Sequence, residues 1–180
     1  MSGEPEDHGR SVTLPHGAVK ILGRQFSDER GESYEVFDDH IFSKYLKSFT
    51  LAQENIIHTR ESGTLRGLHY QTQPFGQAKL VNVLQGKAQF FWASFYRESD
   101  SILYLHSIIL DAGRDILYTP ESCAHGFLAL ENDTVFSLKV SRPVNIEARR
   151  TISFISNRIH VNFAIPPRLD LLSDRDRPSR

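Results

Sequence analysis

The sequence predicts an all-β protein built as a sandwich or barrel, with the jelly-roll type included. Three observations support this class. Most of the middle of the chain consists of short runs in which apolar side chains alternate or fill both faces. Turn signals such as "QG", "DAGRD" and "END" separate these runs. A single segment looks helical. Short strands at this spacing are typical of two-layered β folds, which can hold a ligand at their mouths.

The one expected helix is the segment 38–49, "DDHIFSKYLKSF". Asp38 or Asp39 would cap its first turn, because a short carboxylate side chain can accept the free amide hydrogens there. Apolar residues recur at helical spacing and would face the core. These inward positions are Ile41, Phe42, Tyr45 and Leu46.

Residues 77–96, "QAKLVNVLQGKAQFFWASFY", predict two strands joined by a turn at Gln85 and Gly86. In the second strand Phe91, Ala93 and Phe95 share one face, and Phe90 and Trp92 share the other. A strand that is apolar on both faces lies between two layers. Four further strands are expected in 102–111, 115–120, 124–133 and 134–141.

Composition indicates a globular domain of 180 residues, of which 39% are apolar and 24% charged. The net charge of −1 shows no excess of basic residues, so the composition does not indicate binding to nucleic acid. A single cysteine, Cys123, excludes an internal disulfide, and no apolar run approaches the roughly 20 residues of a membrane span. Because the start "MSGEPEDHGR" lacks signal-peptide features, we expect a cytoplasmic protein. Residues 1–12 are expected to be disordered and 13–180 to form one domain.

Two of the eight histidines stand beside glycine in strand patterns, His69 in "RGLHYQ" and His125 in "CAHGF". A glycine within a strand often marks a bulge or the close approach of a ligand. Arg66 and His69 are three residues apart, so an ideal strand would place them on opposite faces. A bulge at Gly67 would bring both into one cavity. Alternatively, Arg66 lies at the end of the strand and reaches around it.

Five stretches taken in order resemble the motifs of the dTDP-4-dehydrorhamnose 3,5-epimerase (RmlC) family. They are "FSDERGESYEVF", "RGLHYQ", "GQAKLV", "PESCAHGFLAL" and "LLSDRD", and they extend from about Gly23 to Asp176. "RGLHYQ" is the most specific of them. The resemblance implies a cupin-type jelly roll with short peripheral helices, acting as a homodimer. It also implies a place in deoxysugar biosynthesis, of the kind that supplies O-antigen polysaccharides and lipopolysaccharide.

The resemblance further implies a substrate, a nucleoside-diphosphate 4-keto-6-deoxyhexose. His69 would remove a proton alpha to the ketone, at C3, C5 or both, and Asp176 would orient its ring. These roles suit the chemistry, because an imidazole is mostly neutral at cellular pH and a carboxylate on its other nitrogen fixes the tautomer. Lys79 would stabilise the enolate oxygen, and Arg30 and Arg66 would bind the diphosphate. The remaining family positions that line the pocket fall on Phe26, Glu35, Gln53, Asn55 and His125.

The departures from the family pattern concern the acid. The family tyrosine that supplies a proton from the face opposite the histidine is replaced by Leu138 in "FSLKV". Inversion of a carbon needs a proton from that opposite face. The expected catalytic base is therefore present in this chain, but the usual catalytic acid is missing. There are further departures. This chain has Val144 where the family has a second tyrosine, Phe90 and Ser94 where it has two aspartates, and Phe154 where it has a tryptophan.

A metal site is the lesser alternative. Cupin-type jelly rolls usually bind a metal through a His-x-His pair and a later histidine, and this chain has no such pair. His125 would suit the later ligand, but the sequence places no acidic partner beside it. No glycine-rich phosphate loop is present either. We therefore expect no metal and no cofactor.

Three functions remain open from the sequence. The first is an epimerase that inverts one carbon or two. The second is a binding protein that keeps the sugar-nucleotide pocket without turnover, and the third is a keto-sugar isomerase of the cupin class. Retention of both His69 and Asp176 favours chemistry, whereas Leu138 favours the binding protein.

Overall fold

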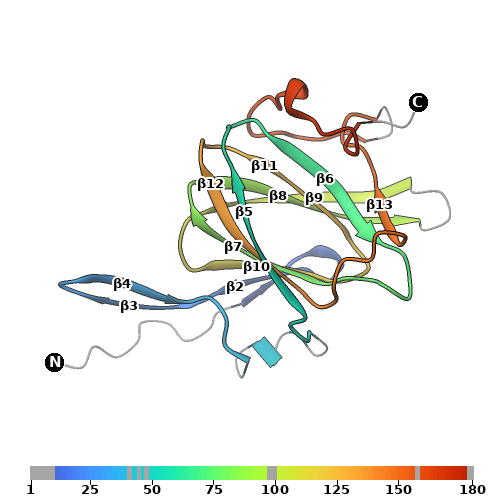
Figure 1. The fold of residues 1–180 in the computed structure, drawn as a ribbon. Coiled ribbons are helices and arrows are strands. Elements are labelled where there is room, and N and C mark those ends of the chain that lie inside the picture. Colours follow the sequence, from blue (N-terminus) through green and yellow to red (C-terminus); the bar gives the residue numbers. More distant parts are fainter. Residues whose placement is uncertain are drawn as a thin grey trace.

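The computed structural model describes residues 11–39, 42–43, 46, 49–96, 101–156 and 159–177. Its main body consists of two antiparallel sheets that face each other (Figure 1). The six-stranded sheet has the order β1 (Ser11–Thr13), β2 (Val19–Leu22), β10 (Asp115–Thr119), β7 (Lys79–Gln85), β12 (Thr134–Val140) and β5 (Gln53–Thr59). The five-stranded sheet has the order β13 (Arg149–Thr151), β6 (Leu65–Gln71), β11 (Ala124–Ala129), β8 (Lys87–Tyr96) and β9 (Ser101–Asp111).

The remaining elements are small. Strands β3 (Arg24–Asp28) and β4 (Gly31–Glu35) form a separate hairpin, which projects from the barrel in Figure 1. Two short 3₁₀ helices, η1 (Pro15–Gly17) and η2 (Leu169–Leu171), flank the sheets. The strands expected from the sequence are confirmed, including the pair β7 and β8 around the turn at Gly86. That glycine has a φ of 75°, a conformation that residues with a Cβ rarely adopt.

The main core lies between the two sheets. It joins Val81, Val83 and Phe136 of the six-stranded sheet to Phe90 and Trp92 of the five-stranded sheet. Burial of each such side chain contributes roughly 1.5–3 kcal/mol to stability. This arrangement follows from the alternation along β8, whose even-numbered aromatic residues point inward.

A second core covers the outer face of the five-stranded sheet. Phe91 and Ala93 of β8 pack there against Phe154 and other apolar residues of the C-terminal segment. The prediction that β8 lies between two layers is therefore confirmed. Because the C-terminal segment is anchored on this face, residues 173–177 are carried past strand β6 at the edge of the barrel (Figure 1).

The expected helix at 38–49 is described only in part. The amide of Phe42 donates to the carbonyl of Asp38 at 2.9 Å, and the amide of Leu46 donates to the carbonyl of Phe42 at 2.7 Å. Both hydrogen bonds have helical spacing. Phe42 and Leu46 are buried on the outer face of the six-stranded sheet, as expected. Ile41 and Tyr45 lie outside the described residues.

The N-terminal boundary needs a correction. Residues 1–10 of the expected disordered segment lie outside the described residues, but Ser11 and Val12 belong to strand β1. They are held there because β1 pairs with β2 in the six-stranded sheet. Across the described part of the chain, no helix is long and apolar enough to cross a membrane.

Candidate active site

Strand β6 carries a bulge that sets the direction of two polar side chains. Its register with β11 places His69 opposite His125 and Arg66 opposite Phe127, with a shift between the two pairs. Since His125 and Phe127 share one face of β11, Arg66 and His69 share a face as well. The bulge expected at Gly67 is therefore confirmed.

Gly67 makes this bulge possible. Its φ is 104°, and a Cβ there would lie 2.8 Å from both the Gly126 Cα and the His125 carbonyl oxygen. A larger residue would thus collide with the backbone of β11. Beyond the bulge, the Arg66 guanidinium lies over the Phe127 ring at 5.9 Å. The glycine in "RGLH" is explained by this close approach of two strands.

His69 is paired with Asp176. Its Nε2 atom lies 2.7 Å from Asp176 Oδ1. The histidine side chain is 23% exposed and that of Asp176 only 4% exposed. The carboxylate also accepts the Gly67 amide at 3.2 Å and the Ser173 hydroxyl at 2.7 Å. Two residues 107 positions apart are therefore held together by a buried, fully hydrogen-bonded carboxylate.

The environment shifts the pKa of both partners downward. Burial alone would raise the pKa of Asp176, but the hydrogen bonds from His69, Ser173 and Gly67 outweigh it, so the carboxyl stays ionised. For His69, burial lowers the pKa and the positive charges of Arg175 and Lys79 lower it further, against the opposing effect of Asp176. A ring with a pKa below 6.5 is neutral, and hence basic, at physiological pH.

Lys79 and His125 point into the barrel near His69. Lys79 shares its face of β7 with the core residues Val81 and Val83. Burial lowers the pKa of Lys79 to about 8. Burial also lowers the pKa of His125 well below its ordinary value, and its Nδ1 has no hydrogen-bond partner among the described residues. Both groups are therefore placed to interact with a polar molecule inside the barrel.

Gln53, Asn55 and Leu138 belong to the opposite wall. The Gln53 side-chain amide donates to Asn55 Oδ1 at 2.9 Å. In the sheet, Leu138 lies directly opposite Asn55 on one side and Val81 on the other, and it packs against the main core. An inward position that would suit a proton donor therefore holds an apolar side chain.

A pocket of about 460 Å³ opens at the His69–Asp176 pair. Besides this pair, it is lined by Arg66, Ser173 and Arg175, with Thr64, Leu65 and Leu171 at its sides. Sequence reasoning missed Arg175, whose Nε lies 3.2 Å from His69 Nε2. The signal available was its position directly before Asp176 in "LSDRD".

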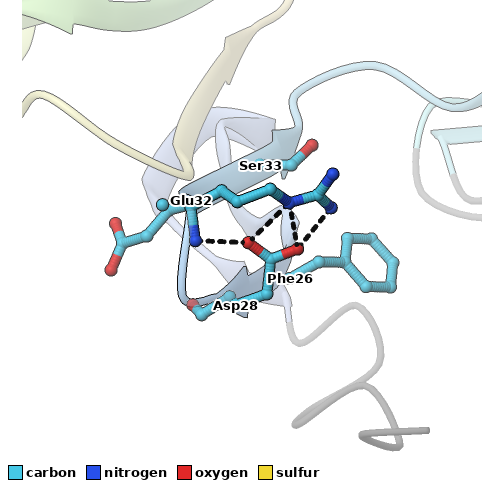
Figure 2. A pocket seen from close by; sticks show the side chains of 7 residues that line it. Phe26, Asp28, Glu32 and Ser33 are labelled. Carbon is cyan, nitrogen blue, oxygen red and sulfur yellow. Dashed lines mark hydrogen bonds and ion pairs between the residues drawn. The ribbon is translucent and has the colours of Figure 1, made fainter.

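Three residues that were expected in the pocket lie elsewhere in the structure. Phe26 and Arg30 line a different hollow, of about 440 Å³, on the β3–β4 hairpin, which Figure 2 shows with Phe26 and Asp28 beside it. Arg30 is bound there to Asp28, at 2.5 Å, and its side chain is 88% exposed. Glu35 pairs with Arg24 at 2.6 Å at the base of the hairpin. Within one chain, the structure does not bring these three residues to His69.

The part of the chain that the structure describes contains no cluster of three or more histidine, cysteine, aspartate or glutamate side chains that could hold a metal ion. The charged groups described near His69 are instead one carboxylate, that of Asp176, and several cations, namely Lys79, Arg66 and Arg175. Such an excess of positive charge suits an anionic ligand.

The chain is similar to nucleotide-sugar epimerases over nearly its whole length. The family model for dTDP-4-dehydrorhamnose 3,5-epimerase matches residues 13–180. The enzyme of that name from Sinorhizobium fredii is 33% identical over 98% of this chain and 91% of its own.

Two solved structures have the same fold. RmlC from Legionella pneumophila, in complex with dTDP-4-keto-L-rhamnose, has a TM-score of 0.83 and 25% identity over 94% of this chain and 90% of its own. ChmJ from Streptomyces bikiniensis, a 3'-monoepimerase in complex with dTDP-quinovose, has a TM-score of 0.77 and 27% identity over 89% of this chain and 81% of its own. The expected cupin jelly roll is thereby confirmed, and the chain belongs to the dTDP-4-dehydrorhamnose 3,5-epimerase family.

Proposed function

We propose that the protein is an epimerase that uses His69 as a base on a nucleoside-diphosphate 4-keto-6-deoxyhexose. The single observation that carries this proposal is the 2.7 Å contact between His69 Nε2 and the buried Asp176 carboxylate. A neutral ring that donates Nε2–H to Asp176 keeps its lone pair on Nδ1. That atom is then the base, and Asp176 stabilises the imidazolium that forms after proton transfer.

The proton removed is the one alpha to the C4 ketone, because its loss gives an enolate rather than an unsupported carbanion. Lys79 stabilises the enolate oxygen with its positive charge, and the burial of its side chain strengthens this interaction. His125 lies directly opposite His69 in the sheet and offers a second polar contact to the sugar. Gln53 and Asn55 contact the sugar from the other wall.

Return of the proton decides the product. Protonation from His69 itself restores the starting sugar, whereas protonation from the opposite face inverts the carbon. Leu138 occupies the position expected for that second donor. We therefore infer inversion at a single carbon, C3 or C5, with water or another group as donor. ChmJ, a relative with the same fold, is a 3'-monoepimerase, so inversion at one carbon is compatible with this fold.

The nucleoside diphosphate binds through arginine. Arg66 lines the pocket at His69, and its planar guanidinium can bond two phosphate oxygens at once. The two solved relatives are bound to dTDP-sugars, which supports a nucleoside-diphosphate ligand for this chain and makes dTDP the first nucleotide to test. No metal takes part in this proposal, so a chelator leaves activity unchanged.

We also infer a homodimer in which each hairpin serves the other subunit. Phe26 at 39% exposure and Arg30 at 88% would otherwise face solvent, on a hairpin that projects from its own barrel (Figure 1). Placed over the pocket of a second copy, the hairpin adds an aromatic ring and a cation for the nucleotide. Glu35 lies at the base of the same hairpin.

We also infer that the enzyme acts in the cytoplasm in deoxysugar synthesis, including the synthesis of O-antigen-type polysaccharides.

A second candidate function follows from Leu138. A homologue that lacks an acid on the second face can bind a sugar nucleotide without inverting it. The two candidates differ in proton exchange, since only an enzyme with a working base removes the alpha proton.

The deciding experiment incubates the full chain with several nucleoside-diphosphate 4-keto-6-deoxyhexoses in D₂O and follows deuterium by NMR. The epimerase proposal expects deuterium at one carbon, both with and without a chelator. Tight binding of a keto-sugar nucleotide without any exchange would establish the binding protein instead. Exchange that depends on an added metal would overturn the metal-free mechanism.

A further inference from the structure

One ring nitrogen of His69, Nε2, has two neighbours with opposite hydrogen-bonding requirements. Nε2 lies 2.7 Å from Asp176 Oδ1, which can only accept a hydrogen bond. The same atom lies 3.2 Å from Arg175 Nε, which can only donate one. Asp176 and Arg175 are consecutive residues, so the same backbone segment delivers both to the ring.

The two contacts exclude each other in a neutral ring. If Nε2 carries the proton, it donates to Asp176, and the lone pair remains on Nδ1. If Nε2 accepts from Arg175, the proton must sit on Nδ1, and the atom needed as base is blocked. The partner of Nε2 therefore decides whether His69 can remove a proton from the sugar.

Asp176 and Arg175 differ in how firmly they are held. The Asp176 carboxylate is buried and fixed by Gly67 and Ser173. Arg175 is exposed and lines the pocket, where, among the described residues, no carboxylate lies within ion-pair distance of its guanidinium. The positive charges of Arg149 and Arg66 repel the guanidinium, whereas the Asp176 carboxylate attracts it without forming an ion pair. Of the two neighbours of Nε2, Arg175 is thus the one that an anion can draw away.

We propose that Arg175 is a positioning residue through which the diphosphate of the substrate sets the tautomer of His69. In the free protein, the Arg175 Nε–H competes with Asp176 for Nε2. A bound diphosphate takes the guanidinium of Arg175, as it takes that of Arg66, because both line its pocket. Nε2–H is then left to Asp176, and Nδ1 becomes basic only when substrate is present. This inference rests on the proposed function, since it assumes that the pocket binds a diphosphate.

The loss of a cation beside the ring acts in the same direction. The charge of Arg175 lowers the pKa of His69, so its neutralisation by phosphate makes the ring a stronger base. The charges that face His69 are those of Arg175 and Asp176 on the C-terminal segment and Lys79 on β7, and His125 on β11 lies opposite. Of the three charged groups, Arg175 is the one exposed in the pocket.

The test is NMR of the full chain with ¹⁵N-labelled histidine rings, at a pH where His69 is neutral. The probe is dTDP, which supplies the diphosphate without a reactive sugar. In the wild-type protein we expect the ring proton to be shared between Nδ1 and Nε2 and to move to Nε2 when dTDP is added. In Arg175→Met we expect it on Nε2 from the start, with no response to dTDP. Arg175→Lys keeps a donor and a charge and should keep part of the response.

The matched control is Arg177→Met on the same segment, because Arg177 faces Asp174 rather than His69. It should behave as the wild type. Kinetics of deuterium exchange give a second readout: Arg175→Met should raise KM several-fold and leave kcat nearly unchanged, since the bound substrate already frees the ring. A large fall in kcat with unchanged KM would contradict a positioning role through the diphosphate.

Two NMR outcomes would overturn the inference. One is a free wild-type protein with the proton already on Nε2 alone, and the other is dTDP binding that leaves the tautomer unchanged. Failure of the proposed function looks different. If calorimetry shows no dTDP binding, both the nucleotide site and the diphosphate control are wrong. If dTDP binds and moves the proton but no keto sugar exchanges, only the enzyme activity is wrong.

Discussion

Asp176 fixes His69 from a segment that reaches strand β6 only because the C-terminal part of the chain packs on the outer face of the five-stranded sheet. Its carboxylate accepts hydrogen bonds from the ring, from the Gly67 amide and from the Ser173 hydroxyl. The amide donor belongs to the bulge that turns His69 toward Arg66. One buried carboxylate therefore joins the bulge, the base and the C-terminal segment into a single rigid unit.

The first prediction concerns this pair. His69→Asn should lower the rate of deuterium exchange about 10²–10⁴-fold, the usual contribution of a general base. Affinity for dTDP should change little, because the nucleotide is held by other residues. The control is His58→Asn, since His58 also contacts a carboxylate, that of Asp133 at 2.9 Å, but at the surface. Equal loss of exchange in both variants, or no loss in His69→Asn, would remove His69 from the mechanism.

The second prediction is a bell-shaped pH profile for exchange. The rate should rise with pH as His69 loses its proton, at a pH below 6.5 because burial lowers the pKa of the ring. It should fall again as the pH passes about 8, where Lys79 loses the charge that stabilises the enolate. Lys79→Arg tests the assignment, because a guanidinium stays charged throughout this range. In this variant the fall in rate at alkaline pH should disappear, even if the maximum rate is lower. An unchanged fall would mean that the pKa behind it belongs to another group.

Much of the fold could be predicted because alternation along a strand reports two packing surfaces. The assignment of Phe90 and Trp92 to one face of β8, and of Phe91 and Ala93 to the other, matches the two cores. The bulge was predictable as one of two ways in which Arg66 and His69, three residues apart, could share a cavity. The extent of β1 was not, because the polar residues before it give no strand pattern.

The site was predicted less completely for two reasons. Motif order says which residues a family uses but not where the fold places them, so Phe26 and Arg30 were expected in a pocket that their own hairpin does not reach. Arg175 carried no pattern of its own, because an exposed arginine in a charged tail is usually solvated. Its contact with His69 exists only because Asp176, the next residue, is buried.

The third prediction concerns the diphosphate. Arg66→Ala should weaken dTDP binding about tenfold or more, because a charge-assisted hydrogen bond contributes roughly 1.5–3 kcal/mol. Calorimetry measures the affinity. Arg60→Ala is the control, since Arg60 is exposed and does not line the pocket. Unchanged affinity in Arg66→Ala would mean that the phosphates bind elsewhere.

The fourth prediction tests the shared site. His69→Asn and Arg30→Ala proteins are each expected to be poor catalysts, but a mixture refolded together should regain exchange. Half of the dimers would be mixed and each would hold one intact site, so about a quarter of all sites would be restored. A mixture of His69→Asn with Asp176→Asn should regain nothing, because both residues belong to one chain's pocket.

Recovery in the control mixture, or none in the first, would contradict an exchange of hairpins. Sedimentation equilibrium gives the independent check. If the protein is a monomer at the assay concentration, the dimer proposal is wrong, and Arg30 cannot reach the pocket of a second copy.

The fifth prediction concerns the missing acid. Leu138 lies on the wall opposite β6, between Asn55 and Val81 of the neighbouring strands. Leu138→Tyr would place a hydroxyl on that wall, where it can donate a proton to the face that His69 does not reach. Inversion should then rise relative to exchange, measured by NMR as the ratio of epimerised to merely deuterated sugar. The added volume costs about 1–3 kcal/mol of stability, because the ring enters a packed core.

Leu138→Phe separates the two effects, since it adds nearly the same ring without the hydroxyl. It should share the lower stability and the wild-type ratio of inversion to exchange. If both variants raise the ratio, the ring acts by repositioning the sugar rather than by donating a proton. If neither does, while both still exchange deuterium and remain folded, the donor that completes inversion does not act from β12, and the opposite face of the sugar must be sought against another wall of the barrel.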